Sequence, residues 1–267
     1  MALVSIITAV HPAGSAFLEE TLSSVRRLRL PAGWEYEWCV QEDGPASEIA
    51  DFFAGVERVK YAANGTKLGI ASTRNLALSR AEGEFVRNLD ADDLVFSDAI
   101  EAVVPVFSDS SIHWAVTQAD DLMPDGSRKG FPPDLPFGRV PAGAANAWAE
   151  ARGGNWPIHC AGLLARTASV RALGGWGGVP TDDDIALFAA LSEVTDGWFD
   201  PAITWLYRQH PNQTVRMPYQ REWGDIARRI ALQRVRAVRL AGLSIGAAGV
   251  DENPDVTVAP PVKDSMS

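Results

Sequence analysis

The chain has 267 residues, 46% of them hydrophobic and 22% charged, which fits one large α/β domain with or without a small appendage and argues against intrinsic disorder. The formal net charge of −10 argues against non-specific binding to nucleic acid or to anionic membranes, because both need a positive protein surface. The only two cysteines, Cys39 and Cys160, lie in apolar runs, so we expect buried, reduced thiols and no zinc site.

The apolar residues 1–10 are expected to form a first strand, because they lack the basic region that opens a signal peptide. No apolar run approaches the roughly 20 residues that span a bilayer. We therefore expect a soluble, cytoplasmic protein.

The first half of the chain alternates strand and helix patterns. This alternation predicts a largely parallel sheet with right-handed crossovers. Strands are expected at 2–10, 35–41, 56–61, 85–90 and 112–119, and helices at 15–28, 46–54, 68–80 and 97–107.

After Asp120 the pattern becomes less regular. Residues 124–126 predict a hairpin turn, and the Pro- and Gly-rich residues 130–143 predict a loop. Further elements are expected as a strand at 160–165, a helix at 167–173, a Gly-rich turn at 174–178, a helix opened by residues 181–184, a strand at 198–207 and an Arg-rich helix at 218–242. We interpret the arginines as a solvated or internally salt-bridged face. The tail from residue 250 predicts disorder.

The expected strand at 85–90 ends in a cluster of acids, namely Asp90, Asp92 and Asp93. Carboxylates that crowd at a strand end repel one another unless a cation lies between them, and Mg²⁺ or Mn²⁺ would suit such oxygen ligands. A second interpretation is a helix cap, with Asp93 or Ser97 at the start of the helix expected at 97–107. The acids alone favour neither interpretation.

Several short motifs, in a fixed order, resemble one family. They are SIITAVHPAG, QEDGP, GIASTRNLAL, NLDADD, RALGGWGG, TDDDIALF and YRQHPNQTV. Together they resemble the family 2, GT-A-fold glycosyltransferases over about residues 3–215. The resemblance implies an α/β fold, a Rossmann-like GT-A domain at 1–215 with a mostly parallel sheet and flanking helices. A C-terminal helical extension would follow at 216–249, and the tail at 250–267.

The resemblance also implies roles for single residues. Asp92 is expected to bind a divalent metal, Mn²⁺ or Mg²⁺, with His210 completing the shell. Asp43 is expected to accept a hydrogen bond from the base, commonly uracil, although a turn-forming Asp before Gly44 is an alternative. Asp90 would contact the ribose, or the metal through water. The residues expected to bind the nucleotide sugar are Thr8, Val10, Asp43, Arg74, Asp90 and Ala91.

The general base of the family lies in an acidic motif at a helix start, which Thr181–Asp184 resembles. We expect Asp182 in this role and Asp183 as the alternative, because Thr181 stands where the family usually has an acid. All three acids could instead only favour the helix N-terminus. Trp156 and His159 are candidates for the acceptor cleft.

These expectations describe a metal-dependent, inverting glycosyltransferase that moves a sugar from a nucleotide diphosphate, expected to be UDP, to an acceptor hydroxyl. A sugar-phosphate nucleotidyltransferase is one alternative, but the loop after the first expected strand has one Gly and no Lys or Arg to hold a triphosphate. A non-catalytic nucleotide-sugar binding module is another. The expected acceptor is a soluble molecule, and peripheral membrane association through the Arg-rich helix stays open.

Overall fold

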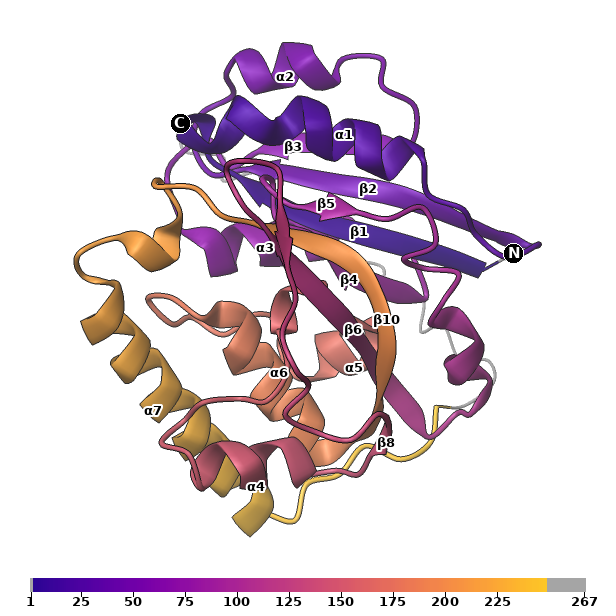
Figure 1. The fold of residues 1–267 in the computed structure, drawn as a ribbon, viewed down its shortest axis with the longest axis vertical. Coiled ribbons are helices and arrows are strands. Elements are labelled where there is room, and N and C mark those ends of the chain that lie inside the picture. The colour runs from indigo at the N-terminus through magenta and orange to yellow at the C-terminus, as the bar shows by residue number, and fades with distance from the viewer. Residues whose placement is uncertain (1, 249–267) are drawn as a thin grey trace, which may run out of the picture.

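The structure is a computed structural model that describes residues 2–248 (Figure 1). Within these residues ten strands form one sheet, in the order β3-β2-β1-β4-β9-β6-β10-β5, with β7 paired to β6 and β8 to β10. The strands are β1 Ala2–Val10, β2 Trp34–Glu42, β3 Val59–Ala63, β4 Phe85–Asn88, β5 Leu94–Val95, β6 Ile112–Leu122, β7 Arg128–Lys129, β8 Gly138–Val140, β9 Leu164–Arg166 and β10 Asp196–Arg208.

The long strands of the sheet are mostly parallel. β1 pairs in parallel with β2 and β4, β2 with β3, and β6 with β10. The short β9 joins the two parallel parts in antiparallel pairing with β4 and β6, and β5 and β8 pair in antiparallel fashion with β10. The expected α/β fold with a largely parallel sheet is therefore confirmed.

Helices cover both faces of the sheet. The helices are α1 Leu18–Arg26, α2 Glu48–Phe53, α3 Ile70–Ser79, α4 Ala144–Glu150, α5 Thr167–Ala172, α6 Asp183–Val194 and α7 Gln220–Leu240. α1 and α2 pack with Ile6, Trp38 and Val40 on one face. α3, α5 and α6 pack with Ile7, Cys39 and Val86 on the other. Strands buried on both faces are nearly continuous apolar runs, as in β1.

The C-terminal helix α7 lies along α6 and α4 (Figure 1). Ala231 and Val235 pack against Ala189 of α6. Arg239 is 2.8 Å from Glu193 and 3.1 Å from Glu150 at the closest atoms. These contacts agree with an internally salt-bridged face for this Arg-rich helix. No helix within residues 2–248 is both long and apolar enough to cross a bilayer.

The α-helix expected at 97–107 is wrong, and with it the capping role of Asp93 or Ser97. Asp93 leads into strand β5, and the segment continues as turns and a 3-10 helix at Val104–Ser108. Pro105 explains the difference, because it lacks an N–H and disfavours helical geometry at the residue before it. Helix α4 lies outside the expected elements, and the loop at 130–143 contains β8. The tail at 250–267 lies outside the described residues.

The topology brings four chain segments to one edge of the sheet. Val10 at the end of β1 is in register with Glu42 at the end of β2, and Ile7 with Asn88 at the end of β4. Near the end of β10, Trp205 pairs with Val95, just after the acidic loop. Ligands of open α/β sheets bind outside the carboxyl ends of the strands. This edge is therefore where a site is expected.

Candidate active site

The acidic loop after β4 is fastened to the end of β10. The backbone N–H of Arg208 donates to Asp93 Oδ1 at 2.9 Å, and Arg208 Nε donates to the backbone oxygen of Asp92 at 2.7 Å. His210 Nε2 then lies 2.8 Å from Asp92 Oδ2. Burial and the neighbouring Asp90 raise the pKa of the Asp92 carboxyl, against the opposing effect of His210. Asp93 is buried more deeply, and burial, followed by Asp90 and Asp92, raises its pKa well above the usual value, against the opposing effect of Arg208.

Asp92 and His210 fit part of a metal shell. A carboxylate oxygen and an imidazole nitrogen are donor types that Mn²⁺ accepts. In residues 2–248 no group of three or more His, Cys, Asp and Glu side chains is arranged to hold a metal ion. Cations that act on phosphates are commonly bound by one or two protein ligands and by the substrate itself. The two residues suit that kind of site.

Arg74 of α3 lies between two carboxylates. Its Nη1 donates to both oxygens of Asp183 at 2.8 and 2.7 Å, and its Nη2 donates to Asp90. The Arg74 side chain is 3% exposed. The guanidinium is therefore occupied by protein carboxylates, and it links the acidic loop after β4 to the start of α6. This contact supports a positioning role for Arg74, whereas a direct contact with a nucleotide stays a prediction.

The three acids at the start of α6 have different surroundings. Asp182 adopts a left-handed backbone conformation, with φ of 55°, and its Oδ2 accepts from Arg228 Nε of α7 at 3.0 Å. Asp183 is buried against Arg74, and burial raises its pKa although Arg74 opposes the shift. Within the described chain, Asp184 makes no hydrogen bond to a cationic side chain. Burial and then the neighbouring Asp183 raise the pKa of Asp184 to about 7, while Arg74 opposes the shift.

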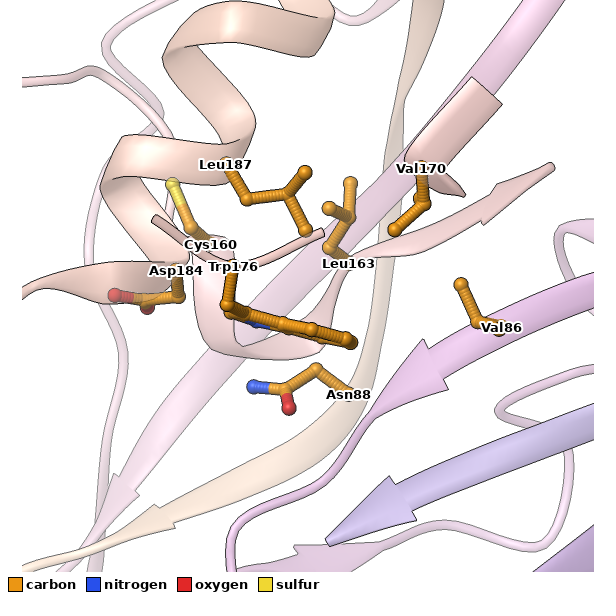
Figure 2. Close-up of a pocket in the computed structure, with 8 residues that line it drawn as sticks. All are labelled: Val86, Asn88, Cys160, Leu163, Val170, Trp176, Asp184 and Leu187. Atoms are coloured by element: carbon orange, nitrogen blue, oxygen red, sulfur yellow. The ribbon is translucent and has the colours of Figure 1, made fainter. Parts of the chain in front are cut away.

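A small cavity of about 10 Å³ lies next to Asp184 (Figure 2). Figure 2 shows the amide of Asn88 beneath the ring of Trp176, with Asp184 beside them. The cavity is lined by Val86, Asn88, Cys160, Leu163, Val170, Trp176, Asp184 and Leu187. A larger groove of about 330 Å³ is formed by Pro31, Trp34, Phe85, Val104 and Phe107 among others. That groove shares no residue with the acidic loop or the start of α6.

The carboxylate of Asp43, just after β2, is part of a hydrogen-bond network. Its Oδ1 accepts from the backbone N–H groups of Leu68 at 2.6 Å and Gly69 at 3.1 Å, and from Asn64 Nδ2 at 3.1 Å. Its Oδ2 accepts only from the Gly69 N–H, at 3.1 Å, among the described residues. Gly69 has φ of +86°, a conformation that glycine adopts without steric cost. These bonds connect Asp43 to the segment before α3 and form no local turn at Gly44, and Oδ2 keeps a lone pair for a further donor.

The other residues expected to bind the nucleotide sugar lie at or beneath this edge. Thr8 is fully buried, and its hydroxyl donates to the backbone oxygen of Leu89 and accepts from Trp38 Nε1. The hydroxyl of Thr8 is therefore occupied by protein partners, and a contact of Thr8 with the nucleotide sugar stays a prediction. Val10 is 2% exposed, and its backbone oxygen accepts from Asp43 N–H at 2.7 Å. Ala91 is half-buried in the acidic loop.

The two candidates for the acceptor cleft, His159 and Trp156, lie in different surroundings. His159 is exposed, with its ring 4.7 Å from that of Trp205 and 4.8 Å from that of Tyr207. Burial, followed by Asp93, Asp90 and Asp92, raises the pKa of Tyr207, so these rings lie beside the acids. Trp156 instead packs between α4, α6 and α7, and its Nε1 donates to Asn146 at 2.8 Å. Trp156 therefore has a structural role.

Several residues of the site were missed in the sequence. Arg208 is adjacent to the motif that contains His210, but its contacts with the acidic loop are long-range. Arg228 reaches Asp182 from 46 positions along the chain. Asn88 precedes the acids by two positions and could have been singled out as a polar residue at the end of an apolar strand.

One protein-family model matches part of the sequence, and solved structures share the fold. Residues 5–129 match the family model described as glycosyl transferase family 2. Among curated protein sequences none matches this chain.

Solved structures share the fold at low sequence identity. S. aureus TarS 1–349 in complex with UDP-GlcNAc has a TM-score of 0.63 and 16% identity, over 85% of this chain and 65% of that chain. Another crystal structure of TarS 1–349 has a TM-score of 0.59 and 16% identity, over 78% of this chain and 60% of that chain. The mannosyltransferase PcManGT from Pyrobaculum calidifontis, in complex with GDP-Man and Mn²⁺, has a TM-score of 0.57 and 16% identity, over 90% of this chain and 74% of that chain. This chain thus spans less than two thirds of the length of those two TarS chains.

Proposed function

The chain carries a glycosyl transferase family 2 domain on a GT-A fold, and on that premise we propose that it is a metal-dependent, inverting glycosyltransferase. It would transfer a sugar from a nucleotide diphosphate to an acceptor hydroxyl. The observation that carries the proposal is the convergence of Asp92, His210, Asp90 and the start of α6 at the carboxyl edge of the sheet. Arg74 links two of these segments directly.

Asp92 and His210 would hold the divalent cation together with the donor diphosphate. A divalent cation, when bound there, stabilises the negative charge that develops on the departing diphosphate. Asp90 is fixed by Arg74, and we expect its remaining acceptor sites to bind a hydroxyl of the donor ribose. Arg208 orients the loop by holding the backbone of Asp92 and the side chain of Asp93.

The acceptor hydroxyl must lose a proton as it attacks, and a carboxylate with a pKa near the working pH is suited to take it. We expected Asp182, with Asp183 as the alternative. Both are engaged by guanidinium groups, Asp182 by Arg228 and Asp183 by Arg74. Asp184 has no such partner among the described residues, and its pKa is raised to about 7. We therefore assign the base to Asp184 and positioning roles to Asp182 and Asp183. Attack opposite the leaving group in one displacement inverts the anomeric centre.

The surroundings of Asp43 favour uridine as the base partner. Its Oδ1 already accepts three hydrogen bonds, whereas Oδ2 accepts one. Each oxygen of a carboxylate has about two acceptor sites, so Oδ2 keeps one. Uracil offers a single N–H and needs one free acceptor. Guanine presents neighbouring N–H groups that suit both oxygens of a carboxylate, and here one oxygen is already used.

The test is donor cleavage with water as the acceptor, which needs no knowledge of the natural acceptor. UDP-glucose, UDP-GlcNAc and GDP-mannose would be incubated with Mn²⁺, and nucleotide release measured. We expect release from a UDP-sugar, little from GDP-mannose, and loss of release in Asp92→Asn. Nucleotide binding without turnover would instead favour a binding module, and pyrophosphate release from UTP with a sugar phosphate would favour a nucleotidyltransferase.

A further inference from the structure

Asn88 is a buried polar residue whose amide has no partner in the described part of the chain. The residue is 4% exposed and ends strand β4. Neither its Nδ2 nor its Oδ1 makes a hydrogen bond with residues 2–248. A buried amide without partners costs roughly 1–3 kcal/mol, so such groups are ordinarily bonded to protein or to ordered water.

The amide faces the small cavity beside Asp184 (Figure 2). At about 10 Å³ the cavity is at the lower limit for one water molecule and too small for a substrate group. Its walls are apolar except at Asn88, Asp184, Cys160 and the indole N–H of Trp176. The Cys160 thiol is directed to the backbone oxygen of Ile158, at 3.5 Å. Asn88 and Asp184, together with the indole N–H of Trp176, are thus the other polar groups in the lining of this cavity.

We propose that this cavity holds one structural water that joins the amide of Asn88 to the carboxylate of Asp184, which makes Asn88 a positioning residue for the base. The inference rests on the proposed function, in which Asp184 deprotonates the acceptor. The water accepts from Asn88 Nδ2 and donates to the Asp184 carboxylate. Its second proton can be donated to Asn88 Oδ1 or to the other carboxylate oxygen. Buried waters typically make about three such bonds.

The water has a definite effect on the titration of Asp184. A hydrogen bond donated to a carboxylate stabilises its charged form and lowers its pKa. Asp183 on α6 and Asp90 after β4 raise the pKa of Asp184. Arg74 of α3 and the backbone N–H of Ile185, which donates to Asp184 Oδ1 at 2.9 Å, lower it. Cys160 and Tyr207 also face Asp184, and Asp184 contributes to raising the pKa of each. Loss of the water therefore shifts the Asp184 pKa upward.

The experiment combines a crystal structure with a titration that does not depend on activity. A crystal structure of the wild-type protein should contain ordered density in the cavity, within hydrogen-bond distance of Asn88 and Asp184. The pKa of Asp184 would be measured from its carboxyl carbon by NMR in wild type, Asn88→Leu and Asn88→Ser. We expect a rise of about one unit in Asn88→Leu, which fills the space with an apolar group. In Asn88→Ser the pKa of Asp184 should stay close to the wild-type value, because the small hydroxyl leaves room for the water.

Ser192→Ala is the matched control. Ser192 is also on α6 and is 1% exposed, and its hydroxyl has no hydrogen-bond partner among residues 2–248, but it does not line the cavity. Its substitution should leave the pKa of Asp184 unchanged. A dry cavity in the wild-type crystal, or equal Asp184 pKa values in wild type and Asn88→Leu, would overturn the proposal even if sugar transfer is observed. If Asn88→Leu does not fold, the crystal density and Asn88→Ser decide. An ordered water with normal Asp184 titration but no transfer would instead contradict the proposed function.

Discussion

Three neighbouring aspartates share one helix start, yet their partners differ. Asp182 contacts Arg228, Asp183 contacts Arg74, and Asp184 contacts neither. Because ion pairing favours the charged form and burial disfavours it, the group without an ion pair keeps the larger effect of burial. At the scale of single residues, the candidate base is therefore distinguished by its partners and not by its place in the acidic motif.

Replacing Asp184 with Asn should lower sugar transfer by roughly 10²–10⁴-fold, the usual contribution of a general base. The base must be deprotonated to act, so the wild-type rate should rise with pH up to about 7 and level off above it. Steady-state rates from pH 5 to 9 would test this. Asp182→Asn serves as the comparison and should lose less activity. A larger loss in Asp182→Asn, with a flat wild-type profile, would return the base to Asp182.

Arg74 provides a second prediction, about stability. Replacing it with Met leaves the buried Asp183 carboxylate unpaired, and breaking a buried pair in this way costs roughly 3–5 kcal/mol. Urea unfolding at pH 7.5 would measure the loss. Arg29→Met is the matched control, because Arg29 forms an exposed pair with Glu101 at 3.3 Å. Exposed pairs contribute about 0–1 kcal/mol. Similar losses in both variants would show that the Arg74 contacts are not tightly formed.

At the scale of elements, α7 holds the start of α6 in an unusual conformation. Asp182 has positive φ, which is uncommon for a residue other than glycine and is maintained by surrounding contacts. Arg228 supplies one such contact, and Gln220 adds hydrogen bonds to Thr181 at 2.9 and 3.0 Å. Helix α7, which lies within the extension expected at 216–249, therefore contacts the start of α6 directly.

Replacing Arg228 with Met should destabilise the protein by about 1 kcal/mol, because the Arg228 side chain is 33% exposed and its pair with Asp182 is partly screened. Transfer should also decline, since the start of α6 loses its support. Arg229→Met is the control: in the described part of the chain, the Arg229 side chain donates to the backbone oxygen of Asp225 within its own helix and to no other group. Urea unfolding and a transfer assay on both variants would check this. Unchanged transfer in Arg228→Met would separate α7 from the site.

At the scale of the whole molecule, the strand and helix order of the first half could be predicted because its apolar runs are long and periodic. β1, β2 and β6 have such patterns, and their carboxyl ends locate the site. The helix prediction for residues 97–107 was wrong because the apolar spacing there is helical, while Pro105 is incompatible with a continued helix. Helix α4 was missed because glycines and prolines surround it, and its stability comes from packing on α6 and α7.

The candidate site could be predicted where its residues lie in recognisable motifs, but not where they depend on partners distant in the sequence. Asp92 and His210 were paired from motifs that lie 118 positions apart, and they are 2.8 Å apart in the folded chain. The distribution of ion pairs among Asp182, Asp183 and Asp184 could not be predicted, because it depends on arginines from α3 and α7. Buried contacts such as Thr8 to Trp38 were equally hidden, since a Thr in an apolar strand gives no sign of its partner.

The central claim is that the site binds a nucleotide diphosphate through a metal held by Asp92 and His210. Calorimetric titration of UDP into the protein, with and without Mn²⁺, tests it most directly. The account predicts at least tenfold tighter UDP binding with Mn²⁺ in the wild-type protein, and no such gain in Asp92→Asn or His210→Ala. Equal UDP affinity with and without Mn²⁺, or a gain that survives both substitutions, would contradict it.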